Sequence, residues 1–382
     1  MRIAFLTNHF PPVIDGVGDY TCHLAAALAR QGQEVHVFCR RQENVDTPAG
    51  AQVHAVAADW SWRSVGQVLR QIRQVRPDWV FVQYVPYGFQ KHGLPLPLVW
   101  LLFCLKIRGL RTAVVFHEFF NGNGLRSFRH APVAAAQYLI GKSLAVLADR
   151  AVVSNDTVAR QLRAGKTKTV RIPVGANFFP ENMVRLPRKH GPTRIVSIGG
   201  GAHRNRLLAD VLALLVHRHG LADCAVVLAG HAETAFAERL RSRARLLGVE
   251  KNLTITGPLN TTEMGRHLES ATLLLLLDTV ERGIGGLAPK SGAAAAAWAF
   301  GLPLLGVRGS LTEPDYFRHE YNCCLAENDA ESVAKACFDL LRDEPLRDKI
   351  AQNGHDLFRQ HLAWDRIAEA YGAIMQPPYS HA

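Results

Sequence analysis

Two segments of the sequence place basic side chains among glycines, a combination suited to binding phosphate groups. Residues 199–206 read GGGAHRNR, and residues 281–292 read ERGIGGLAPKSG. Glycine lets the backbone approach a ligand closely, guanidinium groups hold phosphate oxygens in pairs, and a helix N-terminus attracts an anion. An exposed basic helix start and a flexible surface loop are the structural alternatives. The candidate ligands of phosphate are Arg204, Arg206, Arg282, Lys290, Ser291 and Gly292, with His203 beside the first pair.

The first half of the chain adds a glycine-rich turn and a histidine. Gly16, Val17 and Gly18 lie between an expected strand and an expected helix, where a glycine-rich turn lets the backbone approach a ligand and the helix N-terminus attracts negative charge. A tight turn that needs glycine is the alternative. His117 and Glu118 follow the apolar run 113–116, and the carboxyl end of a parallel strand is where such sheets bind ligands. A buried histidine satisfied by the backbone is the alternative for His117.

These residues sit in a repeating order of strand, loop and helix. Alternation of this kind predicts an α/β protein with parallel, doubly wound sheets. A proline-rich stretch at 179–192 separates two such series and indicates a linker between two Rossmann-like domains. Strands are expected at 2–6, 33–39, 53–57, 79–83, 112–117, 150–154, 194–198, 225–228, 253–255, 272–277 and 303–306. Helices are expected at 18–31, 60–75, 98–105, 134–148, 158–164, 206–217, 234–247, 262–268, 330–342 and 364–375.

Composition limits the class of protein. The chain of 382 residues is long enough for two domains of ordinary size. Its apolar runs are shorter than the roughly 18 residues that span a bilayer, and its N-terminus lacks a secretory signal pattern, so we expect a cytoplasmic protein. Seven scattered cysteines predict reduced thiols. We find no clustered metal-ligand spacing and expect no metal and no cofactor.

The positive charge of the chain is one-sided. The net charge is +11, with 21 Lys and Arg against 10 Asp and Glu in residues 1–175, and 23 against 23 in the rest. This asymmetry favours an anionic surface as partner of the first domain. No nucleic-acid motif accompanies it, so an anionic membrane is the better candidate. The helix expected at 98–105 has the apolar-and-basic pattern of a membrane-surface helix, with an ordinary core helix as the alternative. The basic residues near it are Lys106, Arg108, Arg111, Arg126, Arg129 and Lys142.

The order and spacing of short motifs along nearly the whole chain resemble one family. It is the family 4-like group of retaining GT-B glycosyltransferases, which build bacterial polysaccharides and glycolipids. The chain departs from this family in one respect. Most members have two glutamates eight residues apart, the second of which binds the ribose of the donor, and here Ala296 stands in the place of that second glutamate. The matching motifs are residues 11–18, 34–37, 115–117, 172–177, 197–200, 228–230, 255–257, 290–292 and 299–303.

The resemblance implies a GT-B fold with an acceptor domain at 1–177 and a nucleotide-sugar donor domain at 178–361. A closing helix at about 362–382 would pack back on the first domain. It implies transfer of a sugar from a nucleoside diphosphate sugar to a saccharide or lipid-linked hydroxyl, with retention. His117 would orient the donor sugar, Glu118 would lie beside it, and Arg204, Arg206 and Lys290 would hold the diphosphate. A peripheral contact with the inner face of the plasma membrane would fit a lipid-linked acceptor.

Three other hypotheses about the function of the chain remain at this point. A nucleotide-sugar epimerase of the same fold would need no acceptor. A catalytically silent GT-B partner subunit is kept open by the missing ribose glutamate. An NAD-dependent oxidoreductase is disfavoured, because the six-residue dinucleotide fingerprint is absent.

Overall fold

The computed structural model describes residues 1–120, 130–162, 169–180, 192–201 and 204–376. The chain divides into two compact units. The first comprises Met1–Pro173 and Trp364–Ala382, and the second comprises Val174–Ala363. The boundaries expected from the sequence are 177 and 361. Most of the expected linker at 179–192 lies outside the described residues.

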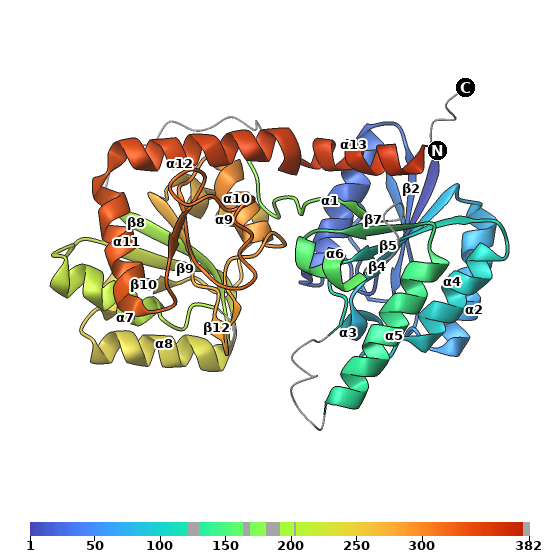
Figure 1. Ribbon diagram of the computed structural model, residues 1–382, viewed down its shortest axis with the longest axis horizontal. Helices are drawn as coiled ribbons and strands as arrows, with labels where there is room; N and C mark the ends of the chain where they lie inside the picture. Colours follow the sequence, from blue (N-terminus) through green and yellow to red (C-terminus); the bar gives the residue numbers. More distant parts are fainter. Residues whose placement is uncertain (121–129, 163–168, 181–191, 202–203, 377–382) are drawn as a thin grey trace. The chain divides into compact units, whose positions relative to one another are not determined.

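A seven-stranded sheet in which every strand pair is parallel forms the centre of the first unit (Figure 1). Its order is β3-β2-β1-β4-β5-β6-β7. Central strands such as β4 are buried along their whole length, as expected for a sheet covered on both faces. The strands are β1 (Arg2–Leu6), β2 (Glu34–Arg40), β3 (Ala51–Ala57), β4 (Trp79–Tyr84), β5 (Arg111–Phe116), β6 (Arg150–Val153) and β7 (Thr169–Arg171).

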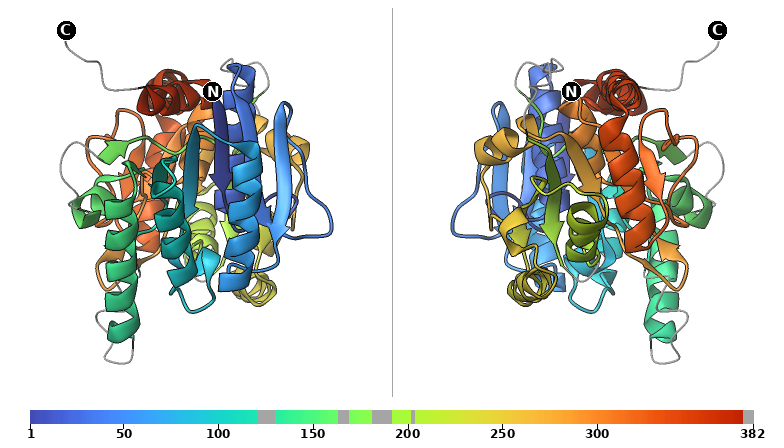
Figure 2. Two further views of the ribbon diagram at one scale, coloured as in Figure 1. Left: turned by 90° about the vertical axis from the view of Figure 1, so that its right-hand side faces the viewer. Right: turned by 90° about the vertical axis from the view of Figure 1, so that its left-hand side faces the viewer.

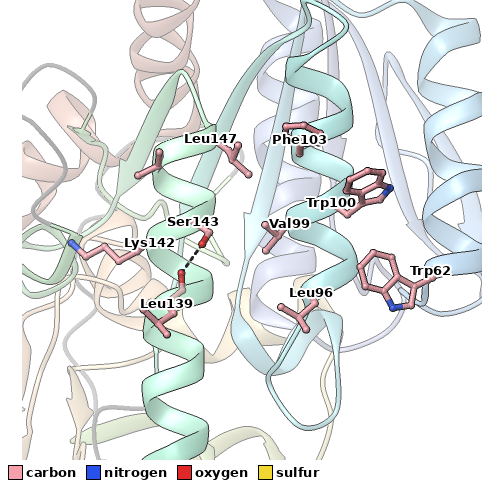
Figure 3. A pocket seen from close by; sticks show the side chains of 10 residues that line it. Trp62, Leu96, Val99, Trp100, Phe103, Leu139, Lys142, Ser143 and Leu147 are labelled. Carbon is pink, nitrogen blue, oxygen red and sulfur yellow. Dashed lines mark hydrogen bonds between the residues drawn. The ribbon is translucent and has the colours of Figure 1, made fainter.

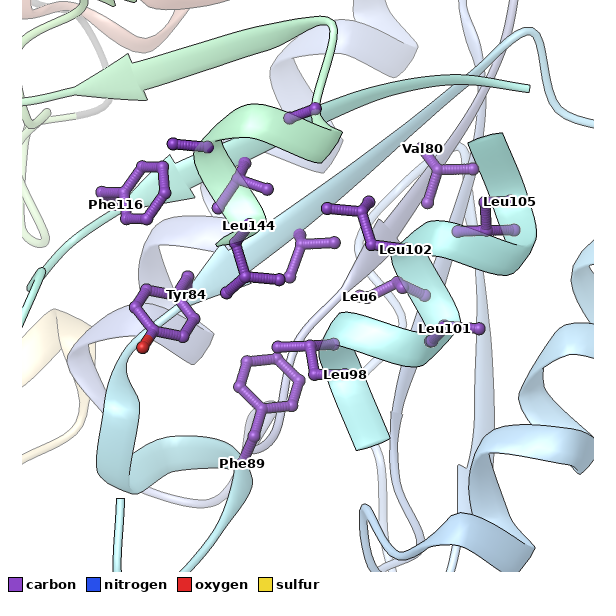
Figure 4. Close-up of a cluster of buried hydrophobic side chains, with 14 of the residues drawn as sticks. Leu6, Val80, Tyr84, Phe89, Leu98, Leu101, Leu102, Leu105, Phe116 and Leu144 are labelled. Carbon is purple, nitrogen blue, oxygen red and sulfur yellow. The ribbon is translucent and has the colours of Figure 1, made fainter. Parts of the chain in front are cut away.

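Helices cover both faces of this sheet. One face packs against α2 (Trp62–Val75), α4 (Leu96–Lys106) and α5 (Ala131–Leu147), whose aliphatic side chains form a common core with the strands. Figure 4 shows the leucines that α4 and α5 contribute to this core. The remaining described helices before residue 163 are α1 (Gly16–Arg30), α3 (Pro86–Phe89) and α6 (Asp156–Leu162).

The last helix of the chain, α13 (Trp364–Met375), belongs to the first unit and packs on α1. The hydroxyls of Tyr20 and Tyr371 lie 3.0 Å apart in the buried contact, and Arg30 pairs with Asp365 at 2.7 Å. The indole of Trp79 donates to the Met375 carbonyl. These contacts join the C-terminal helix to the N-terminal unit.

The second unit repeats the plan with a parallel six-stranded sheet, in the order β10-β9-β8-β11-β14-β15. Its strands are β8 (Arg194–Gly200), β9 (Ala225–Ala232), β10 (Leu253–Ile255), β11 (Leu273–Leu276), β14 (Leu304–Val307) and β15 (Cys324–Ala326). A separate two-stranded hairpin consists of β12 (Val280–Glu281) and β13 (Ile284–Gly285).

Two hydrophobic clusters pack the helices on this sheet. The alanine run makes α10 thin enough for close packing, and the fully buried Trp298 is its one large side chain. The helices are α7 (Leu208–Ala213), which continues as the π-helix η2 (Leu214–Arg218), α8 (Thr234–Leu246), the 3-10 turn η3 (Glu250–Asn252), α9 (Thr261–Glu269), α10 (Gly292–Ala299), α11 (Ala330–Arg342), α12 (Glu344–Leu357) and the π-helix η4 (Phe358–Leu362).

Two doubly wound parallel sheets are confirmed, and α11 and α13 have the expected bounds. The elements that were not expected from the sequence include β7, β15, α3, α12 and the hairpin of β12 and β13. The helix expected at 206–217 begins only at Leu208 and ends as a π-helix. All seven cysteines are free thiols. Among the described residues, no helix has the length and apolar character needed to cross a bilayer.

Candidate functional site

The strand order marks one edge of each sheet as the ligand-binding edge. In each sheet the first strand lies between the second and the fourth, so the chain winds outward in opposite directions from β1 and β4, and from β8 and β11. Ligands of such sheets bind at the carboxyl ends of the strands beside this switch point. Residues 201–206 follow β8 in the chain, and residues 277–281 follow β11. Arg204 and Arg206, two of the predicted phosphate ligands, therefore lie at the switch point of the second unit.

Arg204 is held by a carboxylate at this edge. Its Nε lies 2.6 Å from Oδ1 of Asp278, and its backbone bridges to Asp278 and to Gly201. Both side chains are largely shielded from solvent, at 30% and 18% exposure. The Nε contact uses one edge of the guanidinium, and a guanidinium carries five N–H donors in total. Asp278 thus fixes the orientation of the Arg204 head group.

Asn205 explains why the neighbouring arginines stand where they do. It is fully buried and has φ of 66°, a left-handed conformation that asparagine tolerates. Its Nδ2 donates to the Gly199 carbonyl, its Oδ1 accepts from Ser197, and its backbone N–H donates to Leu277. Asn205 therefore joins the ends of β8 and β11 and turns the chain sharply between the two arginines.

Arg206 pairs with Glu281, with NH1 2.9 Å from Oε1, and both side chains are about half exposed. Glu281 ends β12 of the hairpin, and the hairpin turn is Arg282-Gly283, with φ of 51° and 79°. Positive φ at both central residues is the signature of a type I′ hairpin turn. The beginning of the glycine-rich segment 281–292 thus belongs to a β-hairpin, and Arg282 lies exposed at its tip.

The other end of that segment forms the start of α10. Lys290 is exposed, and the hydroxyl of Ser291 accepts from the Ala294 N–H as the N-cap. A side chain at Gly292 would meet Asn177 Oδ1 at 2.5 Å, so glycine permits residue 177 to approach the helix start. Ser291 and Gly292 each have a structural role here, beside the predicted one in phosphate binding.

In the first unit, His117 directly follows β5. Its backbone N–H donates to the Tyr84 carbonyl, and its Nε2 lies 2.7 Å from Oε1 of the buried Gln83 at the end of β4. Since an amide oxygen only accepts, Nε2 carries the ring proton. The edge of Tyr20 packs on the imidazole, with ring centroids 5.0 Å apart. Glu118 follows as an exposed residue.

The predicted glycine turn opens α1, which begins at Gly16. The Asp15 carboxylate caps this helix by accepting from the N–H groups of Val17 and Gly18, at 3.1 and 2.7 Å. A side chain at Gly18 would meet the His9 carbonyl at 3.0 Å, whereas the space beside Gly16 is open. The Asp15 carboxylate thus already accepts hydrogen bonds from two of the backbone N–H groups that we expected a ligand to contact.

Asp19 lies one turn into α1. Burial, and secondly the charge of Asp15, raise the pKa of Asp19 from 3.8 to about 6. The carboxylates of Asp15 and Asp19 therefore repel one another at the carboxyl-end edge of the sheet, and His9 Nδ1 lies 3.8 Å from Asp15.

The basic residues of the site were predicted from the sequence, whereas the residues that form ion pairs and hydrogen bonds with the site residues were not. Asp278 follows the apolar run of β11 directly, and this position at a strand end is the signal that would have identified it. Gln83 ends the strand expected at 79–83 and so has the same signal, whereas Glu281 and Asn205 have no comparable one. His203, Arg126 and Arg129 lie outside the described residues.

Two family comparisons cover most of the chain. Residues 15–175 match the glycosyl transferase 4-like domain, and residues 178–357 match the glycosyl transferases group 1 family. No curated protein matches the chain in a sequence search.

Solved structures share the whole fold at low identity. Sucrose-phosphate synthase from Thermosynechococcus elongatus is 16% identical, with 98% of each chain covered and a TM-score of 0.72. HepE from Anabaena in complex with UDP is 14% identical, covering 98% of this chain and 99% of that one, with a TM-score of 0.69. WaaG, a glycosyltransferase involved in lipopolysaccharide biosynthesis, is 14% identical, covering 98% of this chain and 100% of that one, with a TM-score of 0.69. Each of these likenesses concerns the fold.

Proposed function

Because the chain belongs to the GT-B glycosyltransferases built from a 4-like and a group 1 domain, we propose that it uses a nucleoside diphosphate sugar as donor. It transfers the sugar with retention to a hydroxyl of a saccharide or lipid-linked acceptor. The observation that best supports a nucleoside diphosphate sugar as donor is the pair of arginines at the β8/β11 switch point, each of which is held by a carboxylate. The similar HepE structures contain UDP and UDP-glucose, which supports the same class of donor here.

In this proposal the second unit binds the leaving diphosphate. Arg204 and Arg206 donate hydrogen bonds to its oxygens, and Lys290 adds charge beside the N-terminus of α10. These groups stabilise the negative charge that grows on the diphosphate as the glycosidic bond breaks. The two arginines are held by Asp278 and Glu281 before the reaction, so little reorganisation of them is needed.

His117 acts on the sugar rather than as a strong base. The leaving phosphate oxygen accepts the proton of the attacking hydroxyl, as a transfer with retention allows. The imidazole, fixed by Gln83 through Nε2, orients the donor sugar near its reacting carbon. The acceptor is a precursor of a bacterial polysaccharide or glycolipid, a proposal that the likeness to WaaG favours.

The test is to follow release of nucleoside diphosphate from UDP-, GDP-, ADP- and dTDP-hexoses with and without an acceptor, and to determine the anomeric configuration of the product by NMR. The proposal expects release that depends on the acceptor and a product with the donor's configuration. Interconversion of donor sugars without an acceptor would show an epimerase instead. Binding of nucleotide without turnover in any mixture would show a silent partner subunit.

A further inference from the structure

One face of the first unit exposes a continuous apolar surface. Along α4 the side chains of Leu96, Trp100 and Phe103 recur every three to four residues and are 40% to 55% exposed. The opposite stripe of the same helix, with Leu98, Leu101, Leu102 and Leu105, is buried in the core. An α-helix that packs on a sheet normally turns polar residues outward. This helix is therefore apolar on the side that faces water.

The neighbouring helices extend the surface. From α5, Leu139 and Val146 are 65% and 67% exposed, and Trp62 at the start of α2 is 59% exposed. Together with α4 they form an open groove of about 760 Å³, which we call the α4/α5 groove (Figure 3). Its lining residues are Trp62, Leu96, Val99, Trp100, Phe103, Leu139, Lys142, Ser143, Val146 and Leu147. The three helices lie side by side over one face of the sheet (Figure 2, left).

The three helices that form this groove carry charges of one sign only. Helices α2, α4 and α5 contain five basic residues and no aspartate or glutamate. Lys106 at the end of α4 donates to the Leu147 carbonyl, and Lys142 reaches from α5 to the side away from α4 (Figure 3). The basic residues are Arg63, Arg70, Arg73, Lys106 and Lys142.

We propose that the α4/α5 groove docks the protein on the surface of an anionic lipid bilayer. Exposed apolar side chains would enter the boundary between headgroups and acyl chains, where tryptophan is favoured. The surrounding lysines and arginines would contact anionic headgroups. A second copy of this chain fits less well, because a symmetric contact would place the basic residues against themselves. The inference uses the first unit alone and does not depend on the proposed transfer reaction.

The test is co-sedimentation with vesicles of phosphatidylcholine alone and with added phosphatidylglycerol. We expect binding only to the anionic vesicles, weakened by salt. Trp100→Ser combined with Phe103→Ser should abolish binding, whereas Leu246→Ser, at a 77% exposed position on α8 of the other unit, should not. Neutralising one basic residue of the three helices, as in Arg63→Gln on α2, should lower the partition coefficient about fivefold. Arg239→Gln on α8 is its matched control.

Tryptophan fluorescence gives a readout that is specific to the groove. Trp62 and Trp100 are exposed, while the other four tryptophans of the chain are at most 5% exposed. Lipids with brominated acyl chains should therefore quench the emission of the wild type in anionic vesicles. The double variant Trp62→Phe with Trp100→Phe should lose most of this quenching.

Three results would overturn the inference. The first is equal binding to neutral and anionic vesicles. The second is binding by the Trp100→Ser, Phe103→Ser variant at the wild-type level. The third is a dimer of the wild type in light scattering together with a monomer of this variant, which would assign the groove to contact with a second copy of the chain. Nucleoside diphosphate binding, measured on the same variants in solution, keeps a failure of docking distinct from a failure of the proposed function.

Discussion

Arg204 Nε and Asp278 Oδ1 lie 2.6 Å apart, although 74 residues separate them in the sequence. The contact joins the segments that follow β8 and β11, the two strands of the switch point. Such a charge-assisted bond fixes the plane of the guanidinium and leaves further N–H groups for another acceptor. The pair therefore prepares one cation of the second unit to receive a ligand.

Removing Arg204 should weaken binding of the nucleoside diphosphate. Loss of a hydrogen bond to a charged group costs about 1.5–3 kcal/mol, which corresponds to about a tenfold to hundredfold rise in Kd. We expect this rise in isothermal titration of Arg204→Ala. The matched control is Arg243→Ala, which removes an arginine paired with Asp210 on the helical surface of the same unit. An equal effect in both variants would attribute the change to net charge and not to the site.

His117→Ala should lower kcat by about 100-fold to 1,000-fold, the usual effect of losing one positioned group that stabilises a transition state. Gln83→Leu should lower kcat less, because the imidazole remains and loses only the acceptor that fixes its Nε2 proton. The control is Tyr84→Phe on the same strand. The Tyr84 hydroxyl is buried and has no hydrogen-bond partner among the described atoms, so its removal should leave kcat unchanged. An unaltered kcat in His117→Ala would remove this residue from the mechanism.

Two helical glycines should respond to alanine in opposite directions. A methyl group at Gly354 in α12 would lie 2.1 Å from Cδ1 of the fully buried Trp298, so Gly354→Ala should lower the free energy of unfolding by about 1–3 kcal/mol. The space beside Gly372 in α13 is open. Gly372→Ala should therefore stabilise its helix by about 0.5–1 kcal/mol. Thermal unfolding of both variants measures the difference, and a neutral Gly354→Ala would contradict the packing described for α10 and α12.

Asp19 should make stability fall as pH rises. Its pKa is raised by burial and by Asp15 from 3.8 to about 6. Between these values the native state binds more protons than the unfolded state, so the free energy of unfolding decreases with rising pH and levels off above about pH 6. Asp19→Asn should remove this decrease and raise Tm at pH 7. Parallel curves for variant and wild type between about pH 4 and pH 6 would contradict the raised pKa.

The fold was predictable because its signals are local. Apolar strands and amphipathic helices alternate along the chain, and this alternation identifies the two sheets. The missed helix α12 contains Gly354 in its interior, a residue that lowers helix propensity and is required there by Trp298. The missed strand β15 has only three residues, too few for a periodic pattern.

The candidate site was predictable only in part. Positions at strand ends identified His117 and Arg204, since parallel strands bring their carboxyl ends to one edge. The partners Gln83 and Asp278 come from other strands, and pairing across a sheet depends on strand order. The hairpin at Arg282 was missed because its strands have two residues each and the run is rich in glycine.

The central claim is that the second unit binds the diphosphate of a nucleotide sugar. We would measure the thermal shift with UDP, GDP, ADP, CMP and dTDP for the wild type, Arg204→Ala and Lys290→Ala. A ligand at a hundred times its Kd adds about 2.7 kcal/mol to the free energy of unfolding. The account predicts a clear rise in Tm with at least one nucleoside diphosphate and its loss in both variants. No shift with any nucleotide, or an undiminished shift in the variants, would contradict it.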